Sequence, residues 1–334
     1  MPTLNDYQDH LRILGRRYTD ALEQAGFDAV VLGAGLEQMH FLDDQGPVFR
    51  ANPMLVQWLP LLSHPGALLL FRPGSEPLVM VVSDDDYWHL PPQLPPSPWR
   101  DAIEIRVATD PAAGLAALGE LPARTALVGP PAHWAALEVA GERNPPKLID
   151  SLHYQRSVKT GYEIELMREA TALGVAGHHA AREAFDNGGS EFDILLAFLN
   201  ASRQHAAELP YPAIVAADKH AAVLHYQFYE RDHAPTASLL IDAGCASCGY
   251  ASDITRTYAA DDRAEFSALI DAMDRLQQQL CEQVRPGLQF AELQDRAHRG
   301  VAGLLAEHRL IDADAGEILA AGATHCFFPH GLGH

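Results

Sequence analysis

The stretch SLLIDAGCASCGYASDITRTY, residues 238–258, decides the fold of the second half of the chain. Its first five residues are apolar up to Asp242 and its last nine alternate in polarity, so both ends are predicted to be β-strands. Gly244 and Gly249 bracket the residues between them, a pattern typical of a tight hairpin. Side chains that face each other across such a pair have Cβ atoms roughly 4.5–5.5 Å apart. We therefore expect Asp242 and Asp253 to lie close together on neighbouring antiparallel strands.

Two carboxylates at that spacing repel each other unless a cation lies between them. Two divalent ions roughly 3.5–4 Å apart can share such ligands. The alternative is that both residues are acids of a turn or an edge strand, solvated by water. The pair in an otherwise apolar hairpin favours the cation site, because burying an unpaired charge is costly.

The composition is that of an ordinary globular protein. The chain has 334 residues, of which 48% are hydrophobic and 20% are charged, so it has room for two domains and a large core. Its formal charge of −20 argues against nucleic acid or an anionic membrane as a partner and is compatible with bound cations. The N-terminus has no apolar signal core and the chain has no long apolar run, so we expect a cytoplasmic protein.

Four cysteines are too few for a disulfide scaffold. Cys245 and Cys248 are spaced as in a redox or zinc pair, but no second such pair accompanies them. Both also fall in the predicted hairpin turn. We therefore interpret them as incidental thiols.

The first part of the chain alternates between predicted helices and strands, which defines an α/β domain that we assign to residues 1–155. Residues 4–26 show apolar side chains at helical spacing, with Gly26 as the stop. Five prolines between Leu90 and Pro98 predict an extended surface loop. A second helix is predicted at residues 111–118, and buried strands are predicted at residues 29–32, 67–71, 78–82, 103–107 and 125–129.

The pattern of predicted elements changes near residue 155, and residues 156–334 are assigned to a second domain. Helices are predicted at residues 162–185, 191–205, 266–284 and 290–307, and a strand at residues 213–216. The second helix pair repeats the first at an offset of 98 residues, from Phe192 to Phe290. A true duplication and two generic helix pairs both remain open. Under the repeat, residues 325–328 correspond to the strand and a second hairpin is expected after the last residue, so the sequence is predicted to stop within a domain.

Three histidines join the two aspartates as candidates for a site. His330 and His334 stand four apart in PHGLGH, where two glycines disfavour a helix, so this is not the helical HExxH zinc arrangement. His225 falls in an apolar stretch that we predict to be a strand, residues 222–226. A lone histidine in a strand is typical of a hydrogen-bonded core residue. Because Asp242, Asp253 and the two histidines of PHGLGH fall in the same domain, one shared site is favoured. Oxygen and imidazole ligands without thiolate suit Mn²⁺, Co²⁺ or Zn²⁺.

Seven motifs spread over nearly the whole chain occur together. They are LLIDAGCASCGYASDITRTY (239–258), PHGLGH (329–334), HAAVLHY (220–226), FLDD (41–44), NP (52–53), DYWH (86–89) and LHYQRSVKT (152–160). With these motifs the sequence resembles the pita-bread metallopeptidases and, within them, the bacterial Xaa-Pro dipeptidases, also called prolidases. The resemblance implies an α/β N-terminal domain followed by an α+β pita-bread catalytic domain of the creatinase/aminopeptidase type, with the C-terminal part of that domain missing.

The resemblance implies two divalent metal ions per subunit, with Mn²⁺ favoured and Co²⁺ or Zn²⁺ possible. Their ligands are Asp242, Asp253, His334 and two glutamates, and both glutamates belong to the part of the family domain that this sequence lacks. His225 and His330 match catalytic histidines that hold the substrate or the tetrahedral intermediate and pass protons.

Two further residues are implied to bind substrate. Tyr211 matches a residue of the pocket. Asp44, in FLDD, matches an acid that reaches the active site of the partner subunit and meets the free amino terminus of the substrate. A homodimer follows from the resemblance.

The function implied is metal-dependent hydrolysis of Xaa-Pro dipeptides by a water that the two ions activate. Such peptides need a dedicated enzyme, because the imide nitrogen has no N–H and the ring prevents extended binding. Phosphotriester hydrolysis on the same site is an alternative activity. A metal-free binding module with this fold is the non-enzyme alternative, against which the retention of Asp242, Asp253 and His334 speaks.

Overall fold

The computed structural model describes residues 2–83, 87, 90–91, 93–234, 236–260 and 262–333. The chain divides into two compact units, and each is considered by itself. Unit 1 comprises residues 1–176, 199–212 and 244–254, and unit 2 comprises residues 177–198, 213–243 and 255–334. This division follows contacts in space rather than chain order. The boundary after residue 155 therefore stays a prediction.

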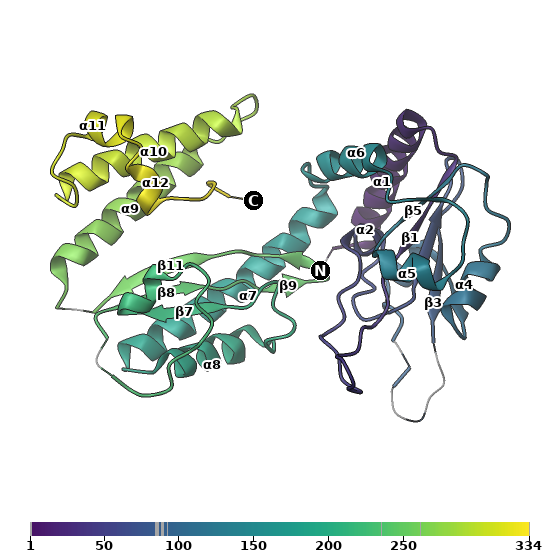
Figure 1. The fold of residues 1–334 in the computed structure, drawn as a ribbon, viewed down its shortest axis with the longest axis horizontal. Coiled ribbons are helices and arrows are strands. Elements are labelled where there is room, and N and C mark those ends of the chain that lie inside the picture. The colour runs from purple at the N-terminus through teal and green to yellow at the C-terminus, as the bar shows by residue number, and fades with distance from the viewer. Residues whose placement is uncertain are drawn as a thin grey trace. The chain divides into compact units, whose positions relative to one another are not determined.

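Unit 1 is built on a mixed six-stranded sheet with the order β4-β3-β2-β1-β5-β6 (Figure 1). The pairs β1–β2 and β2–β3 are antiparallel and the other three are parallel. The five predicted strands are confirmed to within one residue at each end, and only the short β6 was not predicted. The strands are β1 (Ala29–Gly33), β2 (Leu68–Phe71), β3 (Leu78–Val82), β4 (Glu104–Ala108), β5 (Thr125–Val128) and β6 (Glu142–Arg143).

Helices cover both faces of this sheet. They are α1 (Leu4–Ala25), α2 (Pro53–Trp58), α3 (Trp99–Ala102), α4 (Pro111–Ala117), α5 (Pro131–Ala136) and α6 (Pro146–Arg156). Successive side chains of a strand point to opposite faces. Val30 and Leu32 of β1 therefore lie in the core that α1 and α6 share, whereas Ala29 and Val31 lie in the core beneath α4 and α5.

The predicted first helix is confirmed, and its ends show why it forms. The Asp6 N–H donates to the Thr3 side chain, and the Asp6 carboxylate accepts from the Thr3 N–H, so each residue caps the other. Gly26 ends the helix with φ of 85°, a left-handed conformation that glycine adopts without strain. The predicted helix at 111–118 is confirmed as α4. No described residue between Leu90 and Pro98 lies in a helix or strand, as expected for the proline-rich loop.

Unit 2 contains an antiparallel sheet with the order β11-β8-β7, formed by β7 (Ile214–Ala217), β8 (Ser238–Asp242) and β11 (Thr255–Ala259). Strand β8 has the predicted bounds. The predicted strand at 250–258 is wrong in its middle. Residues 250–251 form β10, which pairs with β9 (Ala246–Ser247), and residues 252–254 lie in no strand. Asp242 is paired with Thr255, so the prediction that it faces Asp253 across two strands is also wrong.

The strand is interrupted because Ser252 hydrogen-bonds inward. Its N–H donates to the Cys245 carbonyl at 2.9 Å, and its Oγ accepts from the Cys245 N–H at 3.0 Å and lies 3.0 Å from the Ala170 carbonyl. The close approach needs Gly244, since a Cβ there would lie 1.9 Å from the Ser252 carbonyl oxygen. The alternating polarity of residues 250–258 does not reveal this close approach of Gly244 to Ser252.

Four long helices agree with the predicted ones to within three residues at each end. They are α7 (Gly161–Asp186), which runs from unit 1 into unit 2, α8 (Glu191–Ser202), α9 (Ala264–Glu282) and α10 (Phe290–Glu307). Two short helices follow, α11 (Ala315–Ala320) and α12 (Thr324–Phe327). The strand expected at residues 325–328 from the repeat is therefore wrong. Thr324 is buried and its hydroxyl lies 3.0 Å from His298 of α10, which favours a helical turn at this position.

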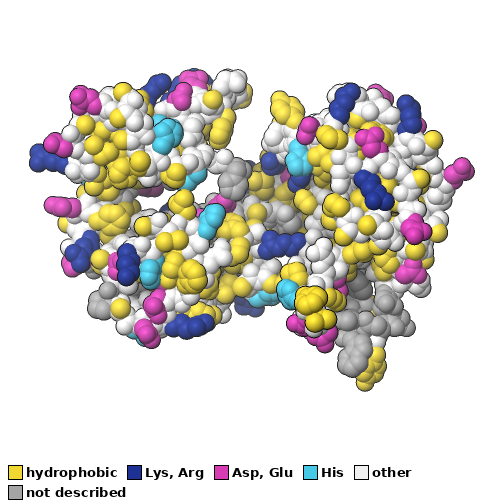
Figure 2. All heavy atoms as spheres, in the orientation of Figure 1, with side chains coloured by type: hydrophobic (Ala, Val, Ile, Leu, Met, Phe, Trp, Pro, Cys, Tyr) yellow, Lys and Arg dark blue, Asp and Glu magenta, His cyan; other side chains and the backbone are white. Residues whose placement is uncertain are grey.

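Charged side chains of both signs are scattered over the face shown in Figure 2. Among the described residues on that face, Lys and Arg do not gather into one basic patch. Within the described ranges, no helix is both long and apolar enough to cross a bilayer.

Candidate active site

Asp253 accepts a hydrogen bond from Tyr211 in unit 1. The Tyr211 Oη lies 2.9 Å from Asp253 Oδ1. A predicted metal ligand and a predicted pocket residue thus come together from segments 42 residues apart. This hydrogen bond holds the Asp253 carboxylate in one orientation relative to the Tyr211 ring.

The segment that carries Tyr211 is held by Arg50. The guanidinium of Arg50 donates to the carbonyl of Pro210 at 2.8 Å and to the carbonyl of Leu209 at 2.9 Å. The planar fork of an arginine matches two adjacent acceptors. Arg50 therefore fixes the backbone immediately before Tyr211, and through Tyr211 it bears on the position of Asp253.

The backbone that leads to Asp253 is braced by two side chains. Gln204 pairs with Ala246 as a neighbouring strand would: its amide nitrogen donates to the Ala246 carbonyl at 2.6 Å, and its oxygen accepts from the Ala246 N–H at 3.1 Å. The Tyr250 hydroxyl donates to Glu163 Oε1 at 3.0 Å. The hairpin β9–β10 is consequently fixed at both of its strands.

Glu163 is a buried carboxylate with three donors. It accepts from the Thr160 N–H at 2.7 Å and from the Gln57 amide at 3.0 Å, in addition to Tyr250. Burial, and then the nearby charge of Glu163, raise the pKa of Tyr250 well above its ordinary value. The phenol of Tyr250 therefore stays protonated and remains a donor.

Asp242 lies at the end of β8 in unit 2 and is half-buried. It is paired with Ile214 on one side and with Thr255 on the other. The carbonyl of the next residue, Ala243, lies 3.0 Å from His178 Nε2, which donates to it. The strand end that presents Asp242 is therefore held by its sheet and by helix α7.

His225 does not lie in a strand, contrary to the prediction. It follows the short 3₁₀ helix η1 (Asp218–Ala222), in an irregular segment, and its side chain is exposed. The apolar residues at 222–226 reflect a buried anchor and not a strand. Tyr226 is 7% exposed and donates from its hydroxyl to Glu191 at 2.8 Å, so the segment is anchored by one buried ring instead of a strand pairing.

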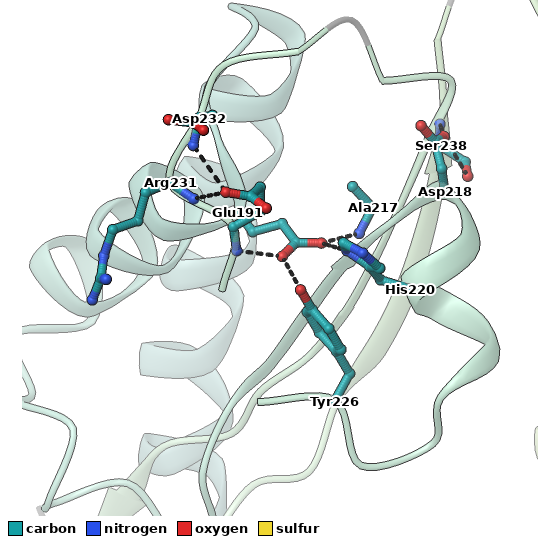
Figure 3. A network of polar contacts seen from close by, with 9 residues as sticks. Glu191, Ala217, Asp218, His220, Tyr226, Arg231, Asp232 and Ser238 are labelled. Atoms are coloured by element: carbon teal, nitrogen blue, oxygen red, sulfur yellow. Dashed lines mark hydrogen bonds and ion pairs between the residues drawn. The ribbon is translucent and has the colours of Figure 1, made fainter. Parts of the chain in front are cut away.

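Figure 3 shows the carboxylate of Glu191 among residues of this segment. Its Oε1 accepts from the Ala217 N–H at 2.8 Å and from His220 Nδ1 at 2.7 Å. Its Oε2 accepts from the Tyr226 hydroxyl at 2.8 Å and from the Glu230 N–H at 2.7 Å. Burial opposes ionisation, but these hydrogen bonds together hold the pKa of Glu191 below its ordinary value, so the group is charged at neutral pH.

His330 lies in the irregular segment after α12 and is exposed. Its ring meets that of Phe328 edge-on, with 4.8 Å between centroids, and Gln294 of α10 donates to its carbonyl at 3.2 Å. His330 also lines a cavity within unit 2. His334 lies outside the described residues, so its predicted role as a ligand is not tested.

Asp44 lies in an exposed loop of unit 1. Phe41 and Leu42, in the same loop, are each 91% exposed. Of the DYWH residues only Tyr87 is described, and its side chain is also exposed. The predicted roles of Asp44, His225, His330 and Tyr211 in binding and catalysis stay predictions.

Among the described residues, no three His, Cys, Asp or Glu side chains form a group that could hold a metal ion. The predicted ligands that are described are Asp242 and Asp253. Carboxylate oxygens suit divalent ions such as Mn²⁺. Each of these two carboxylates is therefore a kind of donor that fits a divalent metal.

Comparison with known proteins places the chain in a family. Residues 5–154 match the N-terminal domain of Xaa-Pro dipeptidases, and residues 165–334 match metallopeptidase family M24. The Xaa-Pro dipeptidase of Stenotrophomonas maltophilia strain R551-3 is 43% identical over 329 residues, which is 98% of this chain and 74% of that protein. The Xaa-Pro dipeptidase of Xanthomonas campestris pv. campestris strain 8004 is 42% identical over the same shares.

Solved structures share the fold. The low-pH form of aminopeptidase P from Escherichia coli has a TM-score of 0.73 at 20% identity, over 99% of this chain and 80% of that chain. Aminopeptidase PepP from Pseudomonas aeruginosa has a TM-score of 0.70 at 22% identity, over 97% of this chain and 77% of that chain. A zinc-substituted E. coli aminopeptidase P in complex with product has a TM-score of 0.73 at 19% identity, over 99% of this chain and 80% of that chain.

Fold and sequence together define a metallopeptidase with an α/β N-terminal domain and a pita-bread catalytic domain, as predicted. The chain belongs to metallopeptidase family M24, with the N-terminal domain found in Xaa-Pro dipeptidases. Use of a divalent metal follows from that membership. The comparisons give no support to the phosphotriesterase or to the metal-free binding module.

Three residues that organise the site were missed by reasoning from the sequence: Arg50, Gln204 and Glu191. The sequence predicts Glu191 only as the first residue of the helix at 191–205, and nothing in the local pattern indicates that its side chain is buried. Arg50 lies two residues before the NP motif, and Gln204 lies in the tail of a predicted helix. Their partners are distant in sequence, so no pattern of spacing identifies them.

Proposed function

We propose that this protein hydrolyses Xaa-Pro dipeptides as a metal-dependent dipeptidase. The observation that carries the proposal is the 43% identity, over 98% of the chain, to a Xaa-Pro dipeptidase. The hydrogen bond from Tyr211 to Asp253 supports it, because a predicted pocket residue holds a predicted metal ligand.

The metal site we propose takes two divalent ions per subunit, with Asp242, Asp253 and His334 among the ligands and Mn²⁺ as the favoured ion. When bound, the ions lower the pKa of the attacking water and supply positive charge to the developing oxyanion. Tyr211 holds Asp253 in one orientation, and β8 together with the Ala243–His178 hydrogen bond holds the backbone of Asp242.

The substrate contacts we propose use four side chains. His225 and His330 hold the carbonyl oxygen and move protons, which their exposure to solvent supports. Tyr211 lines the pocket, and Asp44 receives the free amino group.

A homodimer in which Asp44 serves the partner subunit's active site is part of the proposal. The 91% exposure of Phe41 and Leu42 beside Asp44 supports an interface at this loop, since large exposed side chains at one tip suit a contact. Mixing Asp44→Ala subunits with Asp253→Asn subunits tests it, because mixed dimers then contain one site with both groups intact. Activity should return after verified subunit exchange, and its failure to return would remove Asp44 from the partner's site.

A cytoplasmic location stays a prediction. The four cysteines are all free, which is compatible with a reducing compartment.

The proposed function is tested by substrate profiling of the complete enzyme with Mn²⁺. Gly-Pro should be hydrolysed far faster than Gly-Ala or a Gly-Pro amide, because the enzyme requires the imide and both charged termini. A phosphotriester such as paraoxon should be a poor substrate. Equal turnover of Gly-Pro and Gly-Ala, or preference for the phosphotriester, would overturn the proposal.

A further inference from the structure

The segment that carries His225 has little regular structure of its own. After η1 it has no helix or strand in its described residues before β8 begins at Ser238. Such a segment loses conformational freedom when it is ordered, so its shape depends on the contacts that fix it. We call residues 218–238 the His225 loop.

Its two ends are tied together by Asp218. Asp218 Oδ1 accepts from the N–H groups of Ala237 at 2.8 Å and Ser238 at 2.9 Å. Figure 3 shows this closure between Asp218 and Ser238, at a distance from the Glu191 carboxylate. The ends of the loop are thereby fixed, but the residues around His225 are not.

Glu191 fixes those residues. Its side chain is 1% exposed, and it accepts from His220 and from Tyr226, which flank His225 in sequence. The rings of His220 and Tyr226 stack with centroids 4.6 Å apart and planes 18° apart, so the carboxylate and the stacked rings form one rigid element. The Glu230 N–H adds a contact on the far side of His225.

We propose that Glu191 is a positioning residue for catalysis, which holds His225 in its working place by fixing the loop on both sides. This inference rests on the proposed function, because the role of His225 is part of that proposal. Glu191 does not touch the substrate. It acts through the loop.

A carboxylate is needed at this position for a specific reason. Four donors face its two oxygens, and two of them are backbone N–H groups, of Ala217 and Glu230, that lie on different oxygens. A glutamine has one oxygen and one NH₂ group. Either orientation of its amide sets the NH₂ against one of these N–H groups, and an unmet buried donor is costly. Glu191→Gln therefore releases one side of the loop while keeping the size of the side chain.

The test is a double-mutant cycle of Glu191→Gln and His225→Ala in the complete enzyme, with Gly-Pro hydrolysis as the readout. In the wild-type background, Glu191→Gln should lower kcat by on the order of 10²-fold, the cost of misplacing a catalytic group, with metal content unchanged. In the His225→Ala background the same change should cost less than about threefold, because the residue it positions is absent. Equal losses in the two backgrounds would overturn the proposal and leave Glu191 a general support of the fold.

Two further variants keep the result interpretable. Glu317→Gln makes the same chemical change in the capping box of α11 and should leave kcat unchanged. Tyr226→Phe removes a single donor to Glu191 and serves if Glu191→Gln does not fold. It should also lose activity only when His225 is present, and losses independent of His225 would again contradict the proposal. A wild-type enzyme that does not hydrolyse Gly-Pro would instead refute the proposed function.

Discussion

The hydroxyl of Tyr211 donates to Asp253 Oδ1 over 2.9 Å and joins two segments of unit 1 at the predicted metal ligand. Partners of this kind fix the orientation of a metal-binding side chain, and their loss typically weakens metal binding by about 10–100-fold. Tyr211→Phe removes the hydroxyl and retains the ring. We expect the affinity for Mn²⁺ to fall by about tenfold or more, as measured by titration of the metal-free enzyme.

The control for that variant is Tyr7→Phe. The Tyr7 hydroxyl donates to the Trp58 carbonyl at 2.6 Å in the core of unit 1, far in sequence from both aspartates. Its loss should lower stability without changing the affinity for Mn²⁺. If Tyr211→Phe binds Mn²⁺ as tightly as the wild type, its hydrogen bond does not prepare Asp253 for a metal.

Arg50→Lys tests whether the N-terminal residues shape the substrate pocket. A lysine cannot reproduce the two hydrogen bonds to Pro210 and Leu209 with the geometry of a guanidinium. We expect KM for Gly-Pro to rise by on the order of tenfold, because the Tyr211 backbone is less well placed. The matched control is Arg72→Lys, because the Arg72 guanidinium donates to the Glu120 carbonyl on the surface. Steady-state kinetics compare KM for Gly-Pro in the two variants. Equal KM values in both would contradict the role of Arg50.

His133 predicts a pH dependence of stability. Its Nδ1 accepts from the Gly35 N–H at 2.9 Å, and burial lowers the pKa of its ring to about 4. The folded state therefore favours the neutral ring. Its contribution to stability is full above the unfolded pKa of about 6.5 and is lost as pH falls toward 4.

The variant for this test is His133→Gln, whose amide oxygen can still accept from Gly35. Relative to this variant, the wild type should lose stability between about pH 6.5 and about pH 4, as followed by urea midpoints at several pH values. Parallel profiles of the two proteins across that interval would show that His133 does not titrate in this way.

The backbone around Gly244 leaves no room for a larger residue at this position, which lies in the turn that leads to Asp253. A Cβ there would meet the Ser252 carbonyl oxygen at 1.9 Å, and that carbonyl belongs to backbone that cannot swing aside. Gly244→Ala should destabilise the protein by about 1–3 kcal/mol and weaken Mn²⁺ binding by displacing Asp253. Gly303→Ala in α10 meets nothing within 4 Å and should instead stabilise by about 0.5–1 kcal/mol. Thermal unfolding measures the stability of the two variants. If Gly244→Ala is as stable as the wild type, the close approach of Gly244 to the Ser252 carbonyl is contradicted.

The elements were largely predictable from the sequence because they depend on local patterns. Strands such as residues 78–82 are continuous apolar runs, and α1 carries both a capping box and a terminal glycine. The failures lie where a distant partner overrides the pattern. Ser252 interrupts the strand before Asp253 by bonding to Cys245 and Ala170, and Tyr226 turns an apolar segment into a loop by bonding to Glu191.

For the candidate site, the sequence selects side chains by residue type but does not reveal how they are arranged. The motifs around Asp242 and Asp253 and the family resemblance at Tyr211 select these side chains as metal ligands and a pocket residue, and those roles stay predictions. The supports of those side chains, Arg50 and Glu191, make contacts at sequence separations of up to 160 and 39 residues, which no spacing rule reveals.

The most direct test of the central claim measures bound metal and Gly-Pro hydrolysis together, in the complete wild-type enzyme and in Asp253→Asn. The wild type should hold two equivalents of a divalent ion per subunit and hydrolyse Gly-Pro. The variant should hold fewer equivalents and show no turnover above background, because loss of a shared carboxylate weakens the binding of both ions. Wild-type turnover by Asp253→Asn would contradict the assignment of Asp253 to the metal centre and, with it, the site on which the proposed dipeptidase activity depends.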